Sequence, residues 1–127
     1  MRLALALPFC LLACTGEPVD GTLPEGVYGS PDLALYVDAA GAAALARSCY
    51  SGDLGTPSVS AGELHLDFEW LLIGGDPQPD TAEPYTVAAT LDATVSTTLL
   101  SGTLTSEGEV TDISLRFGEQ PTYYECP

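Results

Sequence analysis

Residues 63–70 alternate strictly between polar and apolar side chains, and no other feature of the sequence restricts the fold as strongly. The apolar positions are Leu64, Leu66, Phe68 and Trp70, and the polar positions are Glu63, His65, Asp67 and Glu69. Successive side chains of a β-strand point to opposite faces of its sheet, so a repeat of two residues indicates a strand. The run therefore predicts a strand with one face in a hydrophobic core and the other in water.

The chain from residue 26 onward carries weaker forms of the same signal, separated by turn residues about every 8–12 positions. We expect strands within residues 27–28, 32–38, 42–50, 63–70, 85–91, 94–105, 110–117 and 121–126. The alanines of residues 42–50 favour a helix, but the segment is short and leads from a turn into Cys49, so we interpret it as a strand. The predicted fold class is all-β, an antiparallel sandwich or small barrel of about seven or eight strands with one disulfide.

The N-terminus has the layout of an export signal. Arg2 supplies a positive charge, and residues 3–13 form an apolar run. A helix that spans a bilayer needs about 20 apolar residues, so this run is too short to cross and instead matches the core of a signal peptide. The sequence Leu11-Leu12-Ala13-Cys14 resembles the bacterial lipobox, with an aliphatic residue at −3, a small residue at −1 and then cysteine.

This resemblance implies cleavage before Cys14 and attachment of a diacylglyceryl group to its sulfur, often with a third acyl chain on the new amino terminus. One acyl chain binds a membrane only marginally, whereas two or three hold a protein there stably. We therefore expect a membrane lipid partner through Cys14 and a location on the exported side of the bacterial cell envelope. Inner and outer membrane both stay open. The alternative is an ordinary secretory signal that contains a chance cysteine.

The charge of the chain excludes several kinds of partner. The formal net charge is −15 at pH 7, with 18 acidic residues and no lysine. Once the leader is removed, Arg47 and Arg116 are the fixed cations. Such a surface repels nucleic acid and anionic lipid headgroups, so we expect neither as a partner.

Two of the four cysteines are left for structural use. Cys10 leaves with the leader and Cys14 is lipidated, so Cys49 and Cys126 remain. An exported chain meets an oxidising compartment, where these two are expected to pair. The long loop between them gives a stabilisation of about 4.5 kcal/mol in the chain-entropy description. The alternative is two free buried thiols.

The predicted organisation is a signal peptide at residues 1–13, a lipidated cysteine with a flexible tether at 14–25, and a β domain at 26–127. The tether interpretation rests on its polar and helix-breaking composition. The domain resembles small exported bacterial β-proteins of unknown function in five segments: Tyr28-Gly29-Ser30, Cys49-Tyr50-Ser51-Gly52, the strand at Tyr85, Phe117-Gly118 and Tyr123-Tyr124-Glu125-Cys126. The resemblance supports the strand at 42–50 and the Cys49–Cys126 pairing, and it implies no activity.

Few residues suggest chemistry. The polar face of residues 63–70 could hold a cation, with Asp67 and Glu69 as candidates, or divide acid and base roles as in glycosidases. We favour a solvated outer face, because alternation alone predicts polar residues there. Calcium could also bind Asp76, Asp80 and Glu83 in the proline-rich loop, although their spacing lacks the order of known calcium loops.

His65 is the only histidine, and no serine-nucleophile motif is present. Trp70 with Tyr123 and Tyr124 could line a ligand pocket, but core packing is the simpler fate of a tryptophan on an apolar stripe. We expect no cofactor and a structural or binding role rather than catalysis. The alternative is a calcium- or small-ligand-binding module that uses the acidic face or the 76–83 loop.

Overall fold

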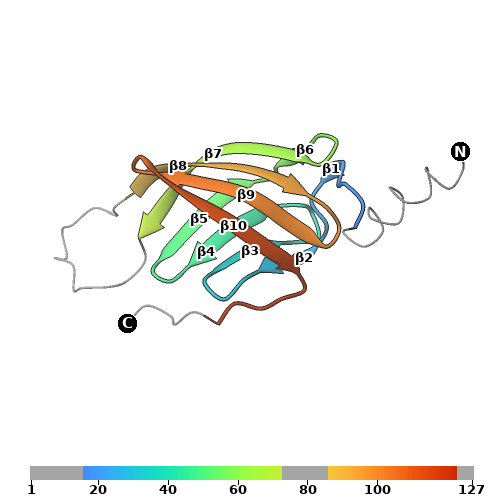
Figure 1. Cartoon of the computed structure of the whole chain (residues 1–127), viewed down its shortest axis with the longest axis horizontal. Coiled ribbons are helices and arrows are strands. Elements are labelled where there is room, and N and C mark those ends of the chain that lie inside the picture. The colour runs from blue at the N-terminus through green and yellow to red at the C-terminus, as the bar shows by residue number, and fades with distance from the viewer. Residues whose placement is uncertain (1–15, 73–85, 123–127) are drawn as a thin grey trace, which may run out of the picture.

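The computed structural model describes residues 16–72 and 86–122, and this part of the chain folds into a closed antiparallel β-barrel (Figure 1). Neighbours around the barrel follow the order β10-β2-β3-β4-β5-β7-β8-β9, and β1 pairs with β6 in a separate two-stranded sheet. The strands are β1 (Gly21–Thr22), β2 (Gly26–Gly29), β3 (Leu33–Val37), β4 (Ala43–Arg47), β5 (Tyr50–Gly55), β6 (Ser58–Val59), β7 (Glu63–Leu72), β8 (Thr86–Val95), β9 (Leu99–Ser106) and β10 (Glu109–Phe117).

The all-β antiparallel prediction is confirmed, and of its two forms the structure is the barrel. Each strand of the barrel pairs with the next barrel strand along the chain, and β10 pairs with β2 to close the ring. The segment at 42–50 contains β4 and then a turn at 48–49 that leads into β5, so the strand interpretation is correct for residues 43–47. Its inward positions explain why: Leu45 is completely buried and Ala43 is 3% exposed, whereas Ala44 and Ala46 at the alternate positions are only half-buried.

The barrel interior is filled by aliphatic side chains that alternate inward along the strands. Those with at most 1% of their surface exposed include Leu35, Leu45, Leu91, Leu100 and Leu115. Tyr28 is also fully buried, and its hydroxyl donates a hydrogen bond to the carbonyl of Ser96 (2.8 Å). Burial raises the pKa of Tyr28 to about 12, so this hydroxyl keeps its proton throughout the physiological range.

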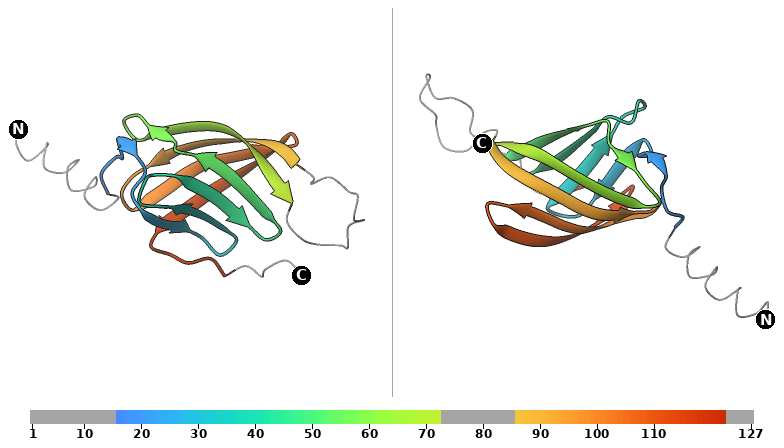
Figure 2. Two further views of the ribbon diagram at one scale, coloured as in Figure 1. Left: turned by 180° about the vertical axis from the view of Figure 1, so that it is seen from behind. Right: turned by 90° about the horizontal axis from the view of Figure 1, so that it is seen from above.

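One end of the barrel is closed by the segment that precedes β2. Val19 is 7% exposed and Leu23 is 3% exposed, and both belong to the core. Backbone hydrogen bonds fix the segment, since the Val19 amide donates to Val95 (3.0 Å) and the Gly62 amide donates to Val19 (2.8 Å). Figure 2 shows β1 lying beside β6 at this end. We call residues 17–25 together with β6 the plug.

The predicted flexible tether at 14–25 is therefore wrong for residues 16–25. The segment does contain the glycines and prolines on which the prediction rested, but it also carries two apolar side chains, Val19 and Leu23. The end of an eight-stranded barrel exposes apolar core, so covering it with these side chains removes apolar surface from water. The plug strand β1 then pairs with β6, which satisfies backbone groups that a free tether would leave to solvent.

Two further expectations differ from the structure. The expected strand at 94–105 is broken at residues 96–98, where the Ser96 hydroxyl accepts a hydrogen bond from the Leu99 amide (3.0 Å) and forms the turn between β8 and β9. Pro121 and Thr122, expected in a final strand, are not part of one, and residues 123–126 lie outside the described residues. Threonine-rich composition favours strands but does not reveal where a hydroxyl turns the chain.

The pairing of β10 with β2 closes the barrel, and we call it the seam. It is short, which leaves the end of the barrel opposite the plug open. β10 pairs with β9 from Glu109 to Arg116, but with β2 only through Arg116 and Phe117. The first part of β10 therefore diverges from the strands that follow the seam. The barrel is closed near the plug and open at the opposite end.

Candidate functional site

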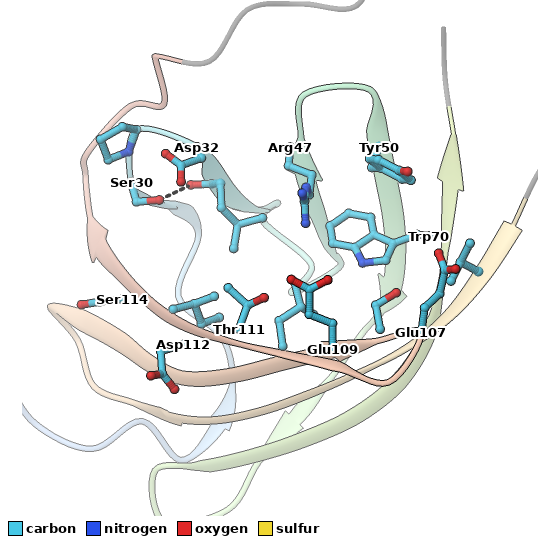
Figure 3. Close-up of a pocket in the computed structure, with 16 residues that line it drawn as sticks. Ser30, Asp32, Arg47, Tyr50, Trp70, Glu107, Glu109, Thr111, Asp112 and Ser114 are labelled. Atoms are coloured by element: carbon cyan, nitrogen blue, oxygen red, sulfur yellow. Dashed lines mark hydrogen bonds between the residues drawn. The ribbon is translucent and has the colours of Figure 1, made fainter. Parts of the chain in front are cut away.

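The open end of the barrel contains a cavity of about 840 Å³, which we call the mouth (Figure 3). It extends from the ends of β4, β7 and β9 to the diverging part of β10. Its lining comprises Ser30, Pro31, Asp32, Leu33, Arg47, Tyr50, Trp70, Val87, Leu104, Ser106, Glu107, Glu109, Thr111, Asp112, Ile113 and Ser114. A concave site of this size accommodates a small organic molecule.

The floor of the mouth is apolar and rigidly packed. Trp70 is 2% exposed and Leu104 is 4% exposed, so the floor is the upper layer of the barrel core. Trp70 meets Phe68 edge to face with 5.3 Å between ring centroids, and meets Tyr50 in the same way at 5.9 Å. Such pairs stabilise each ring in one orientation. The Phe68 ring fits here because Gly52 has no side chain: a Cβ on Gly52 would lie 2.7 Å from the ring.

Arg47 enters the mouth because it stands in the inward register of β4. Ala43 and Leu45 occupy the two preceding inward positions and are buried, so the next alternate residue also faces the interior. Its guanidinium carbon lies 5.5 Å from the centre of the Tyr50 ring, which is a cation–π distance. Figure 3 shows the Arg47 side chain directed toward Trp70.

The opposite wall is β10, whose alternation brings a carboxylate into the cavity. Leu115 is 1% exposed and Ile113 packs on the core, so Thr111 and Glu109 continue the inward face. In Figure 3 the carboxylate of Glu109 points into the cavity and that of Asp112 points away from it. The first inward positions of β10 are therefore polar above an apolar base.

Arg47 and Glu109 do not form an ion pair with each other. Within the described residues the structure contains one ion pair, between His65 and Asp92 on the outer surface. β2 and β3 separate β10 from β4 around the barrel, so the two charged side chains stand on different walls. Three further acids, Asp32, Glu107 and Asp112, surround the rim.

The predicted acidic face lies on the outside of the barrel. Glu63, His65, Asp67 and Glu69 are all exposed on the outer surface of β7, as the alternation implied. Across the sheet, His65 pairs with Asp92, and the Thr90 hydroxyl donates a hydrogen bond to Asp67 (2.7 Å).

Besides pairing with His65, Asp92 changes the pKa of this histidine. The hydrogen bond and negative charge of Asp92, with a smaller contribution from Asp67, raise the pKa of His65 above its ordinary value. Each of these contacts joins two side chains across neighbouring strands, as is usual on a polar sheet face.

This face does not assemble a metal site. In residues 16–72 and 86–122, no three His, Cys, Asp or Glu side chains are grouped in a way that could hold a metal ion. The candidates Asp67 and Glu69 point outward from one strand. Asp76, Asp80 and Glu83 lie outside the described residues, as do Tyr123 and Tyr124. The exposure of all four polar side chains of residues 63–70 agrees with a solvated outer face on β7.

The cysteine predictions fall partly outside the described chain. Cys14 and Cys126 are not described, so lipidation and the disulfide stay predictions. Cys49 lies in the turn between β4 and β5 at the rim of the mouth, with a positive φ of 72°. On the same rim the Thr122 amide donates to the carbonyl of Pro31 (3.1 Å). Thr122 is the last described residue before Cys126.

Sequence reasoning did not identify Arg47 or Glu109. The available signal was the alternation along each strand: each of the two residues is charged and occupies the next inward position after a series of apolar inward side chains. Within one strand, such a residue is indistinguishable from a strand end that has reached solvent. Only the barrel places both ends around the same cavity.

No protein-family model matches this chain, and neither the curated proteins nor the solved structures that were compared with it gave a significant match. In the described ranges there is no helix of the length and hydropathy needed to cross a membrane.

Proposed function

We propose that this protein is a lipid-anchored binding protein of the bacterial envelope, and that its mouth takes a small molecule with an apolar part. The observation that carries the proposal is the asymmetry of the barrel. One end is filled by the plug, and the other is a cavity of about 840 Å³ over an apolar floor. Eight-stranded barrels either fill their interior with side chains or leave space for one small ligand.

The two halves of this barrel divide those roles. Near the plug, Tyr28, Leu64 and Leu100 are at most 2% exposed and occupy the interior. Near the mouth, the inward positions of β9 and β10 end in Ser106, Glu109 and Thr111, whose short or polar side chains do not fill it. Polar groups above an apolar floor are typical of sites that orient an amphipathic ligand.

The location of the anchor fits this division. Cys14 precedes Gly16 by two residues, which together span at most about 7 Å of chain. Residues 17–25 belong to the plug, so an acyl group on Cys14 would attach at the closed end. The mouth would then open away from the membrane, toward the solvent of the compartment.

The binding proposal is tested with N-phenyl-1-naphthylamine, a neutral apolar dye that fluoresces when it leaves water. The mature chain with Cys14→Ser avoids acyl chains and detergent, which would take up the dye themselves. We expect saturable 1:1 binding. Thr111→Trp fills the mouth and should weaken binding about tenfold or more, because the bulky ring occupies the dye's position.

Val110→Trp is the matched control, because Val110 is on the same strand but 63% exposed on the outside. It should bind the dye as the parent chain does. Urea unfolding of both variants would show that each is folded. Absence of saturable binding, or equal weakening by both substitutions, would refute a site in the mouth.

A further inference from the structure

We infer that the mouth recognises a small zwitterion with an apolar side chain, such as a free apolar amino acid or a short apolar peptide, through Arg47 and Glu109. This inference rests on the proposed binding function and names its ligand class. The observation behind it is that two inward-facing charges of opposite sign stand on different walls of one cavity, and neither is paired with the other.

Arg47 provides the anion-binding group. Its guanidinium carbon lies 5.5 Å from the centre of the Tyr50 ring, and the side chain lines the cavity. A guanidinium edge binds a carboxylate through two parallel hydrogen bonds. No carboxylate of the described residues occupies that edge.

Glu109 provides the cation-binding group. It is in the inward register of β10, two positions before Thr111, and its carboxylate points into the cavity (Figure 3). No hydrogen bond or ion pair joins it to another described side chain. A ligand ammonium placed there would also feel the negative potential of Asp32 and Glu107 at the rim.

The charge balance favours a zwitterion over a simple ion. An anion that approaches Arg47 must pass four acids in a chain of net charge −15, which repel it. A simple cation that enters as deep as the floor meets the guanidinium of Arg47. A molecule with both charges offers each wall a partner of opposite sign, and its apolar body would rest on Trp70, Val87 and Leu104.

The test compares four charge forms of one side chain by calorimetry on the Cys14→Ser chain. The probes are L-phenylalanine, N-acetyl-L-phenylalanine, L-phenylalanine amide and N-acetyl-L-phenylalanine amide, with L-leucyl-L-phenylalanine as a longer zwitterion. We expect a zwitterion to bind at least about tenfold more tightly than the matching forms that lack one charge. Each of those forms loses the charge-assisted hydrogen bonds to one of the two walls.

Arg47→Met should remove the advantage of the carboxylate, and Glu109→Gln should remove the advantage of the amine. Arg47→Lys keeps the charge without the two-pronged edge, so it should recover part of the affinity. The matched controls are Arg116→Met, at the plug end of β10, and Glu69→Gln, on the outer face of β7. Both should bind zwitterions as the parent chain does.

The dye and zwitterion experiments distinguish an error in the ligand class from an error in the proposed binding function. If the neutral dye binds in the mouth but all charge forms compete equally, the ligand class is wrong and the binding function stands. If Arg47 and Glu109 instead pair with each other in solution, their substitutions will be coupled in urea unfolding and will leave the order of ligands unchanged. That outcome also overturns the inference. If neither dye nor zwitterion binds, both proposals fail.

Discussion

At the scale of single residues, the outer face of β7 shows how one contact changes the titration of a side chain. His65 is the only histidine in the chain, and its ring is exposed beside Asp92 on the neighbouring strand. The acceptor on Asp92 stabilises the protonated ring, which raises the pKa of His65 above 6.5. The contribution to folding stability is therefore complete below pH 6.5 and disappears as the pH rises through the folded-state pKa.

Substitution of Asp92 by Asn should lower the pKa of His65 toward 6.5, because both the charged acceptor and its negative charge are removed. Asp67→Asn should lower it less, since Asp67 contributes only a smaller Coulombic effect. The measurement is an NMR titration of the single histidine ring. A midpoint that does not move in Asp92→Asn would show that the contact is not maintained in solution.

Other residue-scale features concern space rather than charge. A Cβ on Gly102 would lie 2.0 Å from the carbonyl oxygen of Asp92, so β9 approaches β8 too closely there for any side chain. Gly29 meets a similar limit, with 2.0 Å to the carbonyl of Glu119. These glycines permit close backbone approach, and the sequence alone did not distinguish them from turn glycines.

At the scale of elements, the plug determines which end of the barrel is available. Leu23 and Val19 reach the core from a segment that contributes only the two-residue strand β1. Their burial removes apolar surface from water in the same way as a residue within a barrel strand. The segment is thus part of the folded domain and not a linker to it.

Leu23→Ala should lower the free energy of unfolding by about 2–4 kcal/mol, since a leucine that is 3% exposed leaves a cavity when it is truncated. Urea unfolding followed by the fluorescence of Trp70 measures this. Glu25→Ala, in the same segment but exposed, is the control and should change stability by less than about 0.5 kcal/mol. Equal effects of the two substitutions would mean that the plug is not docked in solution.

At the scale of the whole molecule, the proposed anchor and the plug together orient the barrel. The chain enters the fold at the plug, and β7 runs from the plug end at Glu63 toward the mouth at Trp70. An acylated Cys14 would therefore hold the plug near the membrane and keep the mouth distant from it. A ligand could then reach the mouth from solution without passing the lipid surface.

This orientation predicts how brominated lipids quench tryptophan in liposomes that carry the acylated protein. Trp70, near the mouth, should keep its fluorescence, whereas a second tryptophan introduced by Thr56→Trp beside the plug should be quenched. Cys14→Ser should release the protein from the membrane fraction and abolish the quenching of the introduced tryptophan. Strong quenching of Trp70 in the acylated protein would contradict the proposed orientation.

Much of the fold could be predicted because it is encoded locally. The period of two in residues 63–70 defined β7, its buried face and its solvated face, and β3 followed from the same rule. The strand at 42–50 was instead inferred from the short length of the segment and its position between a turn and Cys49. Alternation reports which side of a strand is apolar. It does not report which strand lies next to it or which end of the sheet is covered.

The sequence by itself determined the all-β antiparallel class, the exposure of Glu63, His65, Asp67 and Glu69, and the burial of Trp70. Only the tertiary structure decided that the strands close into a barrel, because closure depends on pairing Tyr28 with Phe117 across most of the chain. It alone also decided that residues 17–25 cover one end and that Arg47 and Glu109 face a shared cavity. The physical reason is that these properties depend on contacts between residues distant in the chain, for which local periodicity carries no information.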